Sequence, residues 1–130
     1  MKRALFLSQA ILQFFIGLGA VGGGALMIIA PDGRLLTMSV DMLKDSPFRN
    51  FLLPGLILFI VNGVGHLISG VLSVRRHALA GWAGIIFGLG LMIWIFVQVN
   101  MIGGGHWLQY TYFGLGLAEL LLGIGIREQA

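Results

Sequence analysis

Four long apolar segments occupy most of this chain and restrict it to one class of fold. They cover residues 5–30, 51–74, 79–99 and 107–126. An α-helix rises about 1.5 Å per residue, so about 20 apolar residues cross the hydrocarbon core of a bilayer. Only 10% of the 130 residues are charged, whereas a soluble domain carries about 25%. The sequence therefore predicts an all-α polytopic membrane protein, with residues 1–130 forming a single four transmembrane helix bundle.

The distribution of lysine and arginine predicts how this bundle is oriented. Three basic residues lie in the long loop 31–50, whereas five lie in very short segments on the other side: Lys2, Arg3, Arg75, Arg76 and Arg127. Short loops with more basic residues stay in the cytoplasm. The first apolar segment follows Lys2 and Arg3 without a cleavage motif, so we interpret it as an uncleaved span rather than a signal peptide. We expect a multi-pass protein of the bacterial inner (cytoplasmic) membrane, with both termini cytoplasmic and loop 31–50 external.

The external loop 31–50 is the one long connection of the predicted bundle. It begins with Pro31-Asp32-Gly33, a typical turn sequence. Ser39 can cap a short helix that runs through Lys44. Its apolar residues Val40, Met42 and Leu43 favour a position in the membrane interface.

Each predicted span carries polar or small residues on one face, at intervals of three and four. The four faces are Gln9, Gln13, Gly17, Ala20 and Gly24; Asn62, His66, Ser69 and Ser73; Ala80, Gly84 and Gly88; and Tyr112, Gly116, Glu119 and Gly123. Small residues allow close helix contact, and polar side chains can form hydrogen bonds across it. Because the face at Ala80, Gly84 and Gly88 offers such a contact, we predict a homo-oligomer that uses it.

Glu119 is the single most informative residue, because it stands inside an apolar segment. A carboxylate at that depth costs several kcal/mol unless it has a partner or takes up a proton. Counted from the nearest basic residue, Glu119 and His66 lie about 12 and 13 Å deep, and Gln13 about 15 Å. Asn62 follows at about 20 Å on the same scale. We therefore predict a buried cluster of Glu119, His66, Asn62 and Gln13 as the candidate ligand- or proton-binding site.

Two interpretations of this cluster remain open. Glu119 and His66 could form a titratable pair that binds a proton or a ligand, or the cluster could be a hydrogen-bonded element that only aligns the helices. The first interpretation predicts transport or binding of a small molecule, ion or lipid. The alternative is a non-catalytic structural or accessory membrane subunit, packed against itself or a larger membrane complex. An intramembrane enzyme ranks third.

Other chemistry is not indicated by the residues present. The chain has no cysteine, and the three histidines His66, His77 and His106 fall at different levels of the bundle, so no metal site or cofactor is expected. The aspartates all lie in the external loop, far from His66, which argues against a Ser-His-Asp triad. Basic residues sit at helix ends rather than in a cluster, so we expect membrane lipids and not nucleic acid as partners.

One loop motif resembles a known type of protein. The residues Ser46-Pro47-Phe48 and the run from Phe51 to Gly55 resemble a pattern in uncharacterised small bacterial four-helix membrane proteins. One long external loop followed by one short hairpin is similar to the layout of DoxX-type proteins. The resemblance implies the order of the spans and no particular activity.

Overall fold

The computed structural model describes residues 2–36, 47–102 and 107–128, and it is all-α. The elements are α1 (Lys2–Ile29), the short 3-10 helix η1 (Arg34–Leu36), α2 (Leu52–Ile57), the π-helix η3 (Leu58–Val64), α3 (Gly65–Val74), α4 (Ala80–Ile102) and α5 (Trp107–Glu128). Since α2, η3 and α3 follow one another without a break, they form one long helix. The short interfacial helix expected at residues 39–44 lies outside the described residues.

Three of the four long helices are apolar enough to cross a membrane, judged over the described residues. They are Arg3–Ile29, Leu52–Val74 and Ala80–Asn100. Helix α5 is not among them, and its sequence gives the reason: it carries Glu119 in its centre and a polar first turn with Gln109 and Thr111. The chain is therefore a multi-pass membrane protein, with three of the four predicted spans supported by length and hydropathy.

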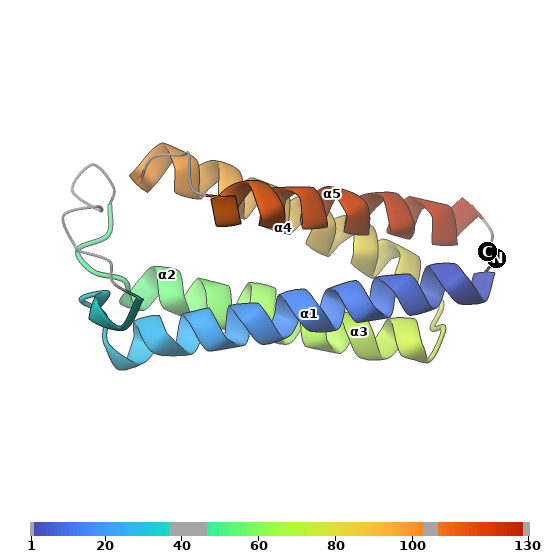
Figure 1. The fold of residues 1–130 in the computed structure, drawn as a ribbon. Coiled ribbons are helices and arrows are strands. Elements are labelled where there is room, and N and C mark those ends of the chain that lie inside the picture. Colours follow the sequence, from blue (N-terminus) through green and yellow to red (C-terminus); the bar gives the residue numbers. More distant parts are fainter. Residues whose placement is uncertain (1, 37–46, 103–106, 129–130) are drawn as a thin grey trace.

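The helices are arranged as two antiparallel pairs. Helix α1 packs along the long helix α2–η3–α3, and α4 packs along α5 (Figure 1). The two pairs contact each other mainly through α1 with α5 and through α3 with α4. Both termini and the α3–α4 turn lie at one end of the bundle, and η1 lies at the other (Figure 1). Among the described residues, Arg34 and Arg49 thus lie at the end opposite to the other predicted group of basic residues, although which end is cytoplasmic stays a prediction.

Glycines bring the backbones within the first pair into contact. A Cβ atom on Gly24 of α1 would lie 2.8 Å from the carbonyl oxygen of Gly55 and 2.8 Å from the nitrogen of Phe59. A Cβ on Gly63 of η3 would lie 3.1 Å from the nitrogen of Val21. Because backbone atoms cannot move aside as a side chain can, these positions admit only glycine without a shift of one helix. Close backbone contact of this kind is a main source of helix association in membranes.

The second pair is joined in the same way, through the small-residue face of α4. A Cβ on Gly88 would lie 2.7 Å from the carbonyl oxygen of Gly116, and a Cβ on Gly123 would lie 2.7 Å from that of Gly81. Ala80 is fully buried. The small-residue face of α4 is therefore used inside the chain, against α5, and the homo-oligomer stays a prediction.

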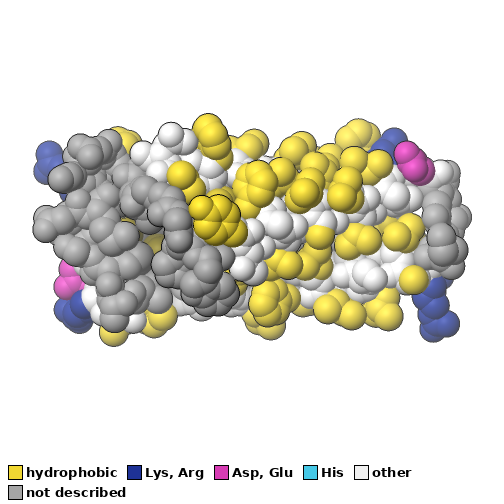
Figure 2. All heavy atoms as spheres, turned by 45° about the horizontal axis from the view of Figure 1, so that its top comes forward, with side chains coloured by type: hydrophobic (Ala, Val, Ile, Leu, Met, Phe, Trp, Pro, Cys, Tyr) yellow, Lys and Arg dark blue, Asp and Glu magenta, His cyan; other side chains and the backbone are white. Residues whose placement is uncertain are grey.

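The outer surface of the bundle is apolar along its middle and charged at its ends. Hydrophobic side chains cover the central part of the face in Figure 2, and lysine or arginine side chains appear at both ends. Each long helix contributes large exposed hydrophobic residues, including Ile11, Phe15, Ile60, Ile68, Ile86, Phe96, Tyr110 and Leu121. A surface of this kind fits the hydrocarbon core of a bilayer rather than water.

The end of α3 stores a small strain that can be measured. Arg76 has a φ of 51°, and the bonds from the His77 nitrogen to the Leu72 oxygen and from the Arg76 nitrogen to the Ser73 oxygen form a Schellman motif. Glycine is preferred at this left-handed position because an L side chain costs about 1–2 kcal/mol there. Arg76→Gly should therefore stabilise the protein by about 1 kcal/mol in thermal or denaturant unfolding.

The adjacent arginine provides the control for this prediction. Arg75 has a φ of −81°, which any residue adopts, so Arg75→Gly removes a similar charge without relieving strain and should not stabilise. Equal stabilisation by the two variants would show that charge, and not the backbone conformation, limits stability at this turn.

Candidate functional site

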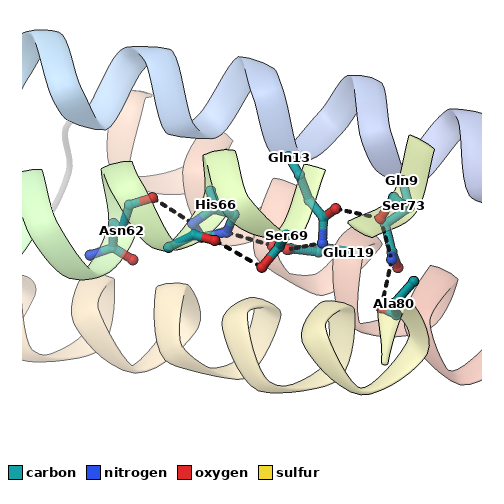
Figure 3. Close-up of polar contacts among 9 residues, drawn as sticks. Gln9, Gln13, Asn62, His66, Ser69, Ser73, Ala80 and Glu119 are labelled. Atoms are coloured by element: carbon teal, nitrogen blue, oxygen red, sulfur yellow. Dashed lines mark hydrogen bonds and ion pairs between the residues drawn. The ribbon is translucent and has the colours of Figure 1, made fainter. Parts of the chain in front are cut away.

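A line of buried polar side chains runs along the bundle axis where the two helix pairs meet. We call it the polar track and define it by Gln9, Gln13, Asn62, His66, Ser69, Ser73 and Glu119 (Figure 3). Two glutamines come from α1, the central residues come from η3 and α3, and Glu119 comes from α5. The interval of three or four residues places each set on the inner face of its helix.

Glu119 lies at the centre of the polar track and has both carboxyl oxygens occupied. Its side chain is 0% exposed. The Oε1 atom lies 2.8 Å from Nε2 of His66, and Oε2 accepts a hydrogen bond of 3.0 Å from Nε2 of Gln13. Glu119 therefore links α5 to both α1 and α3, as a buried carboxyl group in an apolar segment must do to offset its desolvation.

The second bond of His66 determines how many protons the pair holds. Its Nδ1 atom lies 2.7 Å from the backbone carbonyl oxygen of Asn62. A carbonyl oxygen only accepts, so Nδ1 carries a hydrogen. Nε2 then either accepts a proton from a neutral Glu119 or donates one to an ionised Glu119. In both cases one proton lies between His66 and Glu119, and the pair has no net charge.

The part of the polar track beyond Glu119 is a directional chain of hydrogen bonds. Ser73 Oγ donates to Gln13 Oε1 at 2.7 Å. Gln9 Nε2 donates to Ser73 Oγ at 3.0 Å and to the carbonyl oxygen of Ala80 at 2.9 Å. Each amide orientation follows from its neighbour, because Gln13 must present its NH2 group to the carboxylate and its oxygen to the serine. The chain thus ends on a backbone acceptor at the start of α4.

One buried atom in this part of the polar track has no partner. Gln9 Oε1 makes no hydrogen bond in the described structure, and it faces Gly84, where a Cβ atom would collide with it. Because Gly84 has no side chain, the end of the Gln9 side chain can occupy the space beside it.

The structure brings together three of the four predicted site residues. Gln13, His66 and Glu119 are in contact, as their similar predicted depths imply, and their role in binding stays a prediction. Asn62 differs from expectation, since it contributes its backbone carbonyl and not its side-chain amide. Gln9 and Ser73 belong to the same chain of bonds but were not predicted as site residues. The sequence did contain a signal for them, because Gln9 lies on the same helix face as Gln13 and Ser73 lies on the same helix face as His66.

The π-helix η3 was not expected from the sequence. It spans Leu58–Val64 and ends directly before Gly65, so Asn62 lies within it and His66 follows it. The ring of Phe87 on α4 packs against His66, with ring centroids 5.4 Å apart, and it also occupies the space beside Gly65. π-helical turns are rare and occur frequently at functional sites.

No group of three potential metal ligands is present among the residues the structure describes. His77 lies in the exposed α3–α4 turn, where its Nδ1 accepts a hydrogen bond from the Leu79 nitrogen. His106 is outside the described residues. The contact between His66 and Glu119 is therefore the one place in the polar track, among the described residues, where two ionisable side chains meet.

Comparison of the chain with protein-family models, with curated proteins and with solved structures gives no match. The resemblance to DoxX-type proteins stays a prediction, and the case for a function depends on the site geometry.

Proposed function

We propose that this chain is a small membrane transport or binding protein in which the His66–Glu119 pair binds and releases one proton. The observation that carries the proposal is the 2.8 Å contact between His66 Nε2 and Glu119 Oε1, both side chains being fully buried. The proton in this contact lies between two ionisable groups, whereas the other bonds of the polar track, apart from the bond of His66 Nδ1 to the Asn62 oxygen, involve amide or hydroxyl hydrogens. Histidine is the side chain whose ordinary titration falls between about pH 5 and 8.

Helix α5 serves as the fourth span in this proposal. Its 22 residues extend about 33 Å, and it packs along α4, which is itself a candidate span. Its outward face is apolar, with Phe113, Leu117 and Leu121 exposed. Glu119 points inward, so its charge is matched by the polar track and does not face lipid.

Loss of the shared proton would weaken the contact between the two helix pairs. Without it, a lone pair on His66 Nε2 would face a negatively charged Glu119 across 2.8 Å, and the buried site would carry a net charge. Each pair is internally tight because of its glycines, so the strain acts where α5 meets α1 and α3. We propose that this couples proton release to movement of the α4–α5 pair.

Glu119→Gln tests this proposal with little structural disturbance. The new amide NH2 group can donate to Nε2 of His66, and the amide oxygen can accept from Gln13, so every bond is retained. The free energy of unfolding should change by less than about 1 kcal/mol. Proton flux through the reconstituted protein, followed with a pH-sensitive dye inside vesicles, should fall to the rate of protein-free vesicles.

Glu128→Gln is the matched control for this variant. It makes the same atomic change at an exposed position of the same helix, and it should keep the wild-type flux. Wild-type flux from Glu119→Gln would eliminate the proton-binding role. Flux lost equally in both variants would show an effect of overall charge rather than of the site.

A second function is favoured by one observation: the side chains of the polar track largely satisfy one another. A set of buried hydrogen bonds that aligns four helices is what a structural or accessory subunit requires. In that case the unmodified protein should carry no proton flux above protein-free vesicles, and Glu119→Gln should be neutral in every assay. Co-purification of a constant membrane partner would support this function.

A further inference from the structure

The turn between α3 and α4 carries three consecutive polar side chains that take no part in the polar track. Arg75, Arg76 and His77 are all exposed. Neither arginine forms an ion pair with a described residue, and the sequence has no acidic residue between Arg76 and Glu119. The turn therefore presents two positive charges at the end of the bundle without a described acidic partner.

The backbone of this turn is fixed by hydrogen bonds within the chain. The backbone nitrogens of Arg75, Arg76 and His77 all donate to carbonyl oxygens of α3. The Nδ1 atom of His77 accepts a hydrogen bond of 3.0 Å from the Leu79 nitrogen. A neutral imidazole whose Nδ1 accepts carries its hydrogen on Nε2, so His77 offers one side-chain donor. Because the three backbone donors are used, an anion at this turn must be bound by the side chains.

Arg76 stands at a position where glycine would be less strained. Its φ of 51° lies in the left-handed region, which side chains of L-residues rarely adopt. Residues held in such backbone conformations cluster at active sites and ligand-binding sites. An arginine at this position therefore indicates a role for its guanidinium group, since the backbone conformation alone would favour glycine.

Exposed apolar side chains lie on both sides of the three polar residues. Val74 is 60% exposed and Leu79 is 55% exposed. Trp82, in the first turn of α4, is 46% exposed, and the guanidinium carbon of Arg127 lies 4.1 Å from the centre of its ring. Tryptophan is enriched at the level of the lipid headgroups. The turn therefore lies where the apolar surface of the bundle meets the headgroup region.

We propose that the α3–α4 turn binds the headgroup phosphate of an anionic phospholipid through Arg75, Arg76 and the Nε2 hydrogen of His77. Guanidinium groups match phosphate oxygens with two parallel donors, and basic residues near an anionic membrane surface are attracted to it. A zwitterionic headgroup would bring its own cation close to the two arginines. The acyl chains of the bound lipid lie against Val74 and Leu79, a contact that a soluble phosphate cannot make.

The test measures which lipid lies beside Trp82 in vesicles. Trp94→Phe and Trp107→Phe leave a single tryptophan, whose fluorescence is quenched by brominated phospholipids in contact with it. Brominated phosphatidylglycerol should quench Trp82 more strongly than brominated phosphatidylcholine at the same mole fraction. Arg75→Gln and Arg76→Gln should each lower this preference about fivefold, the effect of removing one basic residue near an anionic surface.

Three controls separate the turn from charge in general. Arg76→Lys keeps the positive charge at the strained position and should retain most of the preference. Arg3→Gln removes one exposed positive charge at the same end of the bundle, and it should also keep most of the preference because Arg3 lies on another helix. Inorganic phosphate, added at constant ionic strength because salt screens surface charges, should not reduce the quenching.

Three results would overturn the proposal. One is equal quenching by the two brominated lipids when the turn is unmodified. Another is the same loss of preference in Arg3→Gln as in Arg76→Gln, which would show that the total charge of this end attracts the lipid. The third is displacement of phosphatidylglycerol by inorganic phosphate, which would show a site for soluble anions.

A second measurement covers the case in which the single-tryptophan protein fails to fold. Native mass spectrometry counts the phosphatidylglycerol and phosphatidylcholine molecules that remain bound to the protein with all three tryptophans, and the same arginine variants are compared. Lipid binding is measured without proton flux, so this proposal and the proton-binding function fail separately.

Discussion

His66→Leu is expected to lower the free energy of unfolding by about 3 kcal/mol, because a buried carboxyl group loses its partner, which costs at least as much as one unsatisfied buried polar group. The change leaves Glu119 with one hydrogen-bond partner, Gln13, at a fully buried position. The carboxyl group then has an oxygen facing an apolar side chain. Unfolding in mild detergent, followed by circular dichroism or by a denaturant titration, measures the loss.

The double variant His66→Leu with Glu119→Leu provides the decisive comparison. Removing both members also removes the desolvation cost, so the double variant should be more stable than His66→Leu alone. Since the two residues are in direct contact, a strong departure from additivity is expected. Additive losses of unfolding free energy would mean that the two residues contribute independently and that the 2.8 Å contact does not stabilise the folded protein.

Gly88→Ala is expected to destabilise the protein by about 2–3 kcal/mol through overpacking. The added methyl group would lie 2.7 Å from the Gly116 oxygen and 2.7 Å from the Leu120 nitrogen. Both contacts are with the backbone of α5, so α4 and α5 must separate to accept it. The same unfolding assay, with the wild type measured in parallel, gives the size of the loss.

Gly90→Ala, two residues further along the same helix, is the matched control. Nothing lies within 4 Å of a Cβ at this position, so the substitution should be neutral or stabilise by up to about 1 kcal/mol. If Gly88→Ala proves as mild as Gly90→Ala, the close contact between α4 and α5 is not present in the folded protein. If Gly88→Ala instead keeps its stability but changes the mass in detergent, the small-residue face of α4 contacts another copy after all.

Much of this protein was determined by the sequence alone. Long apolar segments can satisfy their backbone groups in lipid only as helices, so the all-α class and the helix positions follow from composition and length. The similar depth of Gln13, His66 and Glu119 could also be predicted from the sequence, because the number of residues from a helix end sets the depth along a straight helix. The inward direction of Glu119 follows from the cost of exposing a carboxylate to hydrocarbon.

The tertiary structure alone decided which helix faces meet. A stripe of small residues indicates that something packs there, but it does not name the partner, and only the fold shows that Gly88 meets Gly116 within the chain. The fold likewise decided that Asn62, which lies in the π-helix η3, offers His66 its backbone oxygen. Spacing sets the depth of a side chain, whereas its partner depends on how neighbouring helices are rotated and separated. That rotation is set by contacts between residues far apart in the chain.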